Sequence, residues 1–74
     1  MAMRALTGLI EREGDGYVAL CPKLDIASQG ETVEQSRANL REDLEGFFEV
    51  ASPTEIQERL KSEVYVTSLE VAVA

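Results

Sequence analysis

The sequence predicts a two-layer α+β domain with three short antiparallel strands at its start, one main helix packed on the sheet, a short second helix and a C-terminal strand. Apolar runs broken by Gly and Pro fill the first part of the chain, a helical period begins at Thr32, and a strand-like pattern returns in the last residues, EVYVTSLEVAVA. We expect one domain, residues 1–74, because 74 residues supply only one small core.

The first two strands are predicted to form a hairpin. Residues 3–13 are apolar on both faces, which favours a strand near the middle of a sheet. The tetrapeptide GDGY, with Gly14 and Gly16, has the composition of a tight turn, so the next strand begins at Tyr17.

Proline and glycine mark the ends of the next two strands. Pro22 ends the second strand because proline has no N–H for a central ladder. After a turn over residues 23–25, a short third strand at 26–29 is closed by Gly30, which we expect at positive φ.

The main helix is predicted to start after Thr32, a good N-cap, with Gln35 at the position that completes a capping box, and to end before Pro53. At about 100° per residue, one apolar stripe contains Val33, Leu40, Leu44, Phe47, Phe48 and Ala51. The opposite side carries an acidic face made of Glu34, Glu42, Glu45 and Glu49.

Arg37 falls in the middle of the apolar stripe. Its stem could pack on the sheet while its guanidinium reaches water or a carboxylate, or it could form an ion pair across a subunit interface.

The remaining residues predict a short second helix and a last strand. Ser52 is an N-cap followed by Pro53 at the first helical position, and Ile56 and Leu60 supply an apolar side. In the final strand Val64 and Val66 have the opposite parity from Leu69, Val71 and Val73, so either a bulge at residues 67–68 or burial on both faces is required.

Composition excludes several functional classes. The net charge of -7 disfavours direct binding to nucleic acid and favours a basic protein partner. The longest uninterrupted apolar run is the pentapeptide YVALC, too short for a membrane span, and the first residues lack the pattern of a secretory signal, so we expect a cytoplasmic protein.

No residue type points clearly to catalysis. Cys21 has no histidine in the chain to activate it and is expected to be a small buried hydrophobe. The carboxylates of Asp15, Asp25, Asp43 and Glu70 have no spacing typical of a metal site. We therefore predict no catalytic, metal-binding or cofactor-binding residue.

The stretch DGYVALCPKLDIASQGETVEQSRANLRE resembles the core signature of the HicB-like antitoxin family, including its compact single-domain members. The resemblance spans Leu9 to about Phe48. The residues that carry it are Gly16, Tyr17, Pro22, Ser28, Gln29, Gly30, Thr32, Asn39, Leu40 and Glu42. Departures are a loop one residue shorter after Pro22, Gln35 in place of the usual Glu, and polar Ser36 and Asp43 in place of small Ala residues.

The resemblance implies a strand-strand-strand-helix-strand fold, dimers or higher oligomers, and neutralisation of a small basic toxin that cleaves mRNA. Antitoxins of this type usually carry a second, DNA-binding domain, which we do not expect here because residues 49–74 hold only a short helix and a strand. Two hypotheses follow: a non-enzymatic antitoxin-like module with Glu34, Glu42, Glu45 and Glu49 as its partner-binding face, or an orphan structural domain that only self-associates. A third, a small hydrolase that would use Cys21, is disfavoured because the chain has no histidine to activate the thiol.

Overall fold

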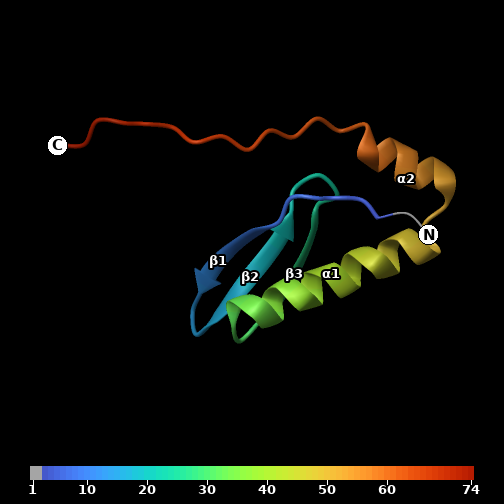
Figure 1. Ribbon diagram of the computed structural model, residues 1–74, viewed down its shortest axis with the longest axis horizontal. Coiled ribbons are helices and arrows are strands. Elements are labelled where there is room, and N and C mark those ends of the chain that lie inside the picture. Colours follow the sequence, from blue (N-terminus) through green and yellow to red (C-terminus); the bar gives the residue numbers. More distant parts are fainter. Residues whose placement is uncertain (1–2) are drawn as a thin grey trace.

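The computed structural model describes residues 3–74 and shows an α+β fold in which a three-stranded antiparallel sheet packs against a long helix (Figure 1). The strand order is β1-β2-β3, the same as the order in the sequence. The elements are β1 (Leu9–Glu13), β2 (Gly16–Cys21), β3 (Ile26–Gly30), α1 (Val33–Val50) and α2 (Pro53–Leu60).

The predicted hairpin is confirmed, with Glu13 paired to Gly16 across a two-residue turn. Gly14 has φ +59° and precedes Asp15, an order typical of a type II′ turn, which needs positive φ at its first central residue. In the second turn Asp25 has φ +54°, a conformation that Asp tolerates better than most residues.

The first strand differs from its prediction in length and position. It begins at Leu9 instead of residue 3. Leu9 is paired with Leu20, and β2 ends at Cys21 just before Pro22, so residues 3–8 have no partner strand for backbone hydrogen bonds. It is also an edge strand, since β2 occupies the centre of the sheet. Leu6 and Ile10 share one face of this segment and pack against the core, whereas Leu9 on the other face is 40% exposed.

Helix α1 begins as the sequence predicts. The Thr32 hydroxyl accepts a hydrogen bond from the Gln35 amide at 3.0 Å, and the Gln35 side-chain oxygen accepts one from the Glu31 amide at 2.6 Å. The first bond satisfies a backbone donor that the first helical turn leaves unpaired. The second satisfies the amide of Glu31, one residue before the N-cap, instead of the N-cap amide that a capping box pairs.

The core is small and aliphatic. Its fully buried side chains come from Ala19 and Cys21 on β2 and from Leu24 in the β2–β3 turn, with Leu40 of α1 nearly so. Burial of Cys21 agrees with the prediction, whereas the burial of Leu24 was not expected from its place in a turn. The partly buried residues around this core are Leu6, Ile10, Ile26, Leu44, Phe47, Phe48 and Leu60.

The buried stripe of α1 is rotated toward Ser36. Ser36 is fully buried and its hydroxyl donates to the Val33 carbonyl at 2.9 Å, so no buried polar atom is left unsatisfied there. Arg37, placed on the stripe by the sequence, is exposed, as is Val33 at 41%. The helix turns a small residue toward the sheet because its first turn approaches β3 closely.

Gly30 lies at that close approach. The prediction that Gly30 has a positive φ is wrong: among the described residues, Gly14 is the glycine with positive φ. A Cβ at Gly30 would lie 2.6 Å from the Ser36 amide nitrogen and 2.9 Å from the Gln35 carbonyl carbon. Glycine is needed here for space between β3 and α1.

The predicted C-terminal strand is not formed in this structure. Residues 62–74 are extended and exposed, and run past the sheet without joining it (Figure 1). A strand exists only when another strand satisfies its backbone groups, and no backbone–backbone hydrogen bond joins residues 63–74 to the other described residues.

We expect Gly30→Ala to lower the free energy of unfolding by about 1–3 kcal/mol, because the added Cβ forces α1 away from β3. Gly46→Ala is the matched control: its Cβ meets nothing within 4 Å, and alanine favours helix by up to about 1 kcal/mol. Urea denaturation of both variants measures the difference. A Gly30→Ala variant as stable as the wild type would contradict the close approach.

Candidate protein-interaction surfaces

The acidic face of α1, defined as Glu34, Glu42, Glu45 and Glu49, lies on the solvent side of the helix. All four residues are exposed, while Leu40 on the opposite side is buried. Among the described residues only Glu45 of this set has an ion-pair partner, Arg41, at 3.6 Å on the exposed surface. An exposed pair of this kind contributes little free energy and offsets only one of the four negative charges, so the face remains negative.

The residues of the sequence signature gather mostly at one end of the sheet. Gly16 and Tyr17 start β2, Gly30 ends β3 and Thr32 caps α1, while Pro22 lies at the far end of β2. A Cβ at Gly16 would lie 2.8 Å from the Gly30 carbonyl oxygen, so both glycines permit close packing. Their shared role is structural.

An open groove of about 570 Å³ lies at this same end, and the sequence analysis did not predict it. Tyr17, Gln29, Glu31 and Asn39 are among the residues that line it. The Asn39 side-chain amide donates to the Gln29 carbonyl at 2.8 Å, and the Tyr17 hydroxyl accepts from the Arg12 guanidinium at 3.0 Å. The Asn39 amide and the Tyr17 hydroxyl are therefore already hydrogen-bonded within the chain.

The residues considered for catalysis or metal binding do not converge. Cys21 is buried in the core, away from solvent. Within residues 3–74, no three His, Cys, Asp or Glu side chains are grouped so that they could hold a metal ion. Asp15, Asp25, Asp43 and Glu70 are all exposed and lie on separate elements.

The open face of the sheet carries a short apolar row. Ala19 and Cys21 point toward α1, so their neighbours on β2 point to the other face. There Leu20 is paired with Leu9 on one side and Ala27 on the other. Within residues 3–74 no helix covers this row, and Leu9 is 40% exposed.

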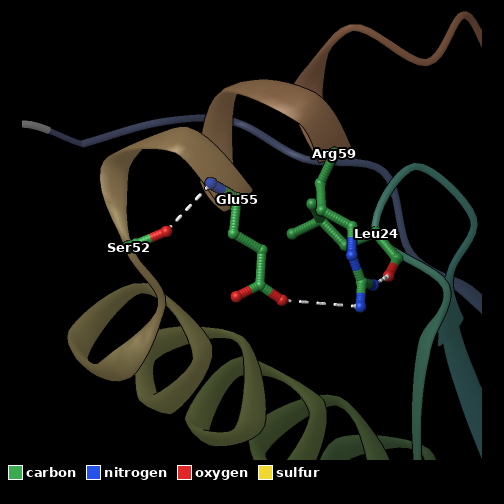
Figure 2. Close-up of polar contacts among 4 residues, drawn as sticks. All are labelled: Leu24, Ser52, Glu55 and Arg59. Carbon is green, nitrogen blue, oxygen red and sulfur yellow. Dashed lines mark hydrogen bonds and ion pairs between the residues drawn. The ribbon is translucent and has the colours of Figure 1, made fainter.

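The Arg59 side chain links helix α2 to the β2–β3 turn (Figure 2). The Arg59 guanidinium donates to the Leu24 carbonyl at 2.6 Å, lies 3.9 Å from the Glu55 carboxylate and sits 5.4 Å from the centre of the Phe47 ring. At the other end of α2 the Ser52 hydroxyl accepts from the Glu55 amide at 3.1 Å, which confirms the predicted N-cap. These contacts determine where the chain leaves α2.

Arg59→Met keeps most of the side-chain length but removes the guanidinium. We expect faster amide hydrogen exchange throughout α2, because a charge-assisted bond to a carbonyl contributes about 1.5–3 kcal/mol. Lys61→Met is the control, since the Lys61 ammonium contacts only the exposed Glu58 carboxylate, at 3.3 Å. Equal exchange rates in α2 for the two variants would show that Arg59 does not hold the helix.

Comparison with known proteins leaves these surfaces as the basis for any functional inference. No family model matches the chain, and no curated protein or solved structure matches it either. Within residues 3–74, the structure has no helix that is both long and apolar enough to cross a membrane.

Proposed function

We propose that the chain is a non-enzymatic protein-binding module whose acidic face on α1 contacts a basic partner. The observation that carries this proposal is the exposure of Glu34, Glu42, Glu45 and Glu49 on the side of α1 that faces away from the sheet. A rigid helix held by two side-chain bonds at its start presents these charges at fixed spacing.

Electrostatics favours a partner of positive charge. The chain carries a net charge of -7, and α1 contributes five acidic and two basic residues to it, a balance of -3. Complementary charge of this kind raises the association rate and selects among partners, and its effect weakens as salt screens it.

The resemblance to HicB-like antitoxins supports a more specific role. In this proposal the partner is a small basic toxin that cleaves mRNA, and the module occludes it in the cytoplasm, where such a toxin acts. The order of β1, β2, β3 and α1 agrees with the first four elements that the resemblance implies. We propose that the fifth, the C-terminal strand, forms when residues 63–74 meet a free sheet edge.

A second candidate role is that of an orphan domain that only self-associates. The exposed apolar C-terminal residues favour this alternative, because they suit pairing between copies without any toxin. The two roles differ in whether a basic partner binds the acidic face.

The direct test is co-purification with the product of the small reading frame next to the gene. We expect Glu34→Gln, Glu42→Gln and Glu49→Gln together to weaken that complex at least about tenfold at low salt, mainly through slower association. The matched control is Glu11→Gln, Glu13→Gln and Asp15→Asn on the β1–β2 hairpin. Each set removes three negative charges and changes the net charge from -7 to -4.

Surface plasmon resonance at several salt concentrations separates the outcomes. A loss confined to the helix variant supports the acidic face. An equal loss in both variants would show a general charge effect, and a neighbouring product that does not bind at all would leave the orphan role as the better account.

A further inference from the structure

The C-terminal segment, residues 63–74, exposes much of the apolar surface of the chain. Six of the ten large hydrophobic side chains that are exposed in the described chain belong to it: Val64, Tyr65, Val66, Leu69, Val71 and Val73. Five of the six are between 59% and 86% exposed. An apolar run of this density is typical of a surface that another chain covers.

The backbone of the C-terminal segment is equally unpartnered. Its residues are extended and rich in β-branched side chains, and Leu69, Val71 and Val73 alternate with Glu70 and Ala72. This is the pattern of a strand with one apolar face. At five residues, the stretch from 69 to 73 has the length of β1.

The outer edge of β1 is the free edge of the sheet. On the other edge, the Gln29 carbonyl of β3 points outward and is occupied by the Asn39 side chain, and α1 packs closely along β3. Gln29 is paired with Val18, so the N–H and C=O groups of Val18 point away from β3 and toward Glu11 on β1. Directions alternate along a strand, so the N–H and C=O groups of Ile10 and Arg12 point outward from β1. The described residues offer these groups no backbone partner.

The path of the chain directs the C-terminal segment beyond its own sheet. The Lys23 ammonium donates to the Ser62 carbonyl at 2.9 Å and, with Arg59, fixes the exit from α2. From there the segment contains no Gly, Pro, Asn or Asp to reverse its direction. Twelve extended residues span about 40 Å, roughly twice the length of a five- or six-residue strand, and Figure 1 shows the segment running past the sheet.

We propose that residues 69–73 of one copy add as a strand to the outer edge of β1 in a second copy, and that the exchange is reciprocal. Each protomer then has a four-stranded sheet, and the edge groups of Ile10 and Arg12 are paired. Reciprocal exchange closes the assembly as a two-fold dimer instead of an open chain of copies.

Such an interface covers exposed apolar side chains and unpaired backbone groups of both copies. Leu69, Val71 and Val73 of each copy enter it with the added strand, together with the β1 edge and the Leu9 side chain, which is 40% exposed. This dimer does not depend on the proposed toxin partner.

Sedimentation equilibrium of the full chain measures the dissociation constant of the dimer and so tests the proposal. One proline variant and one matched control are made in the C-terminal segment, and another such pair at the β1 edge. In the C-terminal segment, Val71→Pro removes one N–H, whereas Val71→Thr retains both the N–H and the preference for strand. At the β1 edge, Arg12→Pro removes an outward N–H, whereas Arg12→Ala removes only the side-chain contact to Tyr17. Thermal unfolding by circular dichroism checks that each protomer remains folded.

We expect the wild type to sediment at twice the 8.1 kDa chain mass, and both proline variants to raise the dissociation constant at least about tenfold relative to their controls. Amide exchange at residues 69–73 should slow as protein concentration rises. A monomeric wild type, or dimers unaffected by Val71→Pro, would overturn the proposal. So would protection of residues 69–73 that is independent of concentration, because it would place the strand on the protomer's own sheet.

Discussion

The close approach of α1 to the end of β3 at Gly30 is the constraint on which the arrangement of this chain depends. The helix can lie there because Gly30 has no Cβ and because Ser36 is small, with its hydroxyl satisfied within its own turn. The Thr32 cap starts the helix at this point, and the Asn39 amide ties its second turn to the Gln29 carbonyl. Once the start of α1 is fixed against β3, helical geometry places Leu40 in the core and the acidic face in solvent.

The same constraint makes the protomer asymmetric. Because α1 packs along β3, one face and one edge of the sheet are covered, whereas the outer edge of β1 and the row of Leu9, Leu20 and Ala27 are not. A chain of this size has few apolar residues to cover them. The apolar residues that could do so lie in the C-terminal segment, which runs past the sheet (Figure 1) from an exit that Arg59 and Lys23 fix.

Local signals in the sequence predicted the elements, and tertiary contacts decided the details that the prediction missed. The caps at Thr32 and Ser52, the turn at Gly14 and the stop at Pro22 act over four or five residues, so they are readable without a fold. The need for small residues at Gly30 and Ser36 comes from the contact between the end of β3 and α1. A helical wheel of α1 alone cannot show that Ser36, and not Arg37, is the buried position. The acidic face was predictable from helical period, but the free β1 edge required the strand order and register.

The folded core carries two candidate interaction surfaces: the acidic face of α1 and an extended C-terminal segment without a backbone partner among the described residues. The central claim is that a second copy provides that partner. The most direct measurement is an isotope-filtered NOE spectrum of a dimer mixed from labelled and unlabelled chains. The account predicts intermolecular contacts between residues 69–73 of one copy and β1 of the other. Random-coil shifts for residues 69–73 without such contacts, or contacts to β1 only within one chain, would contradict it.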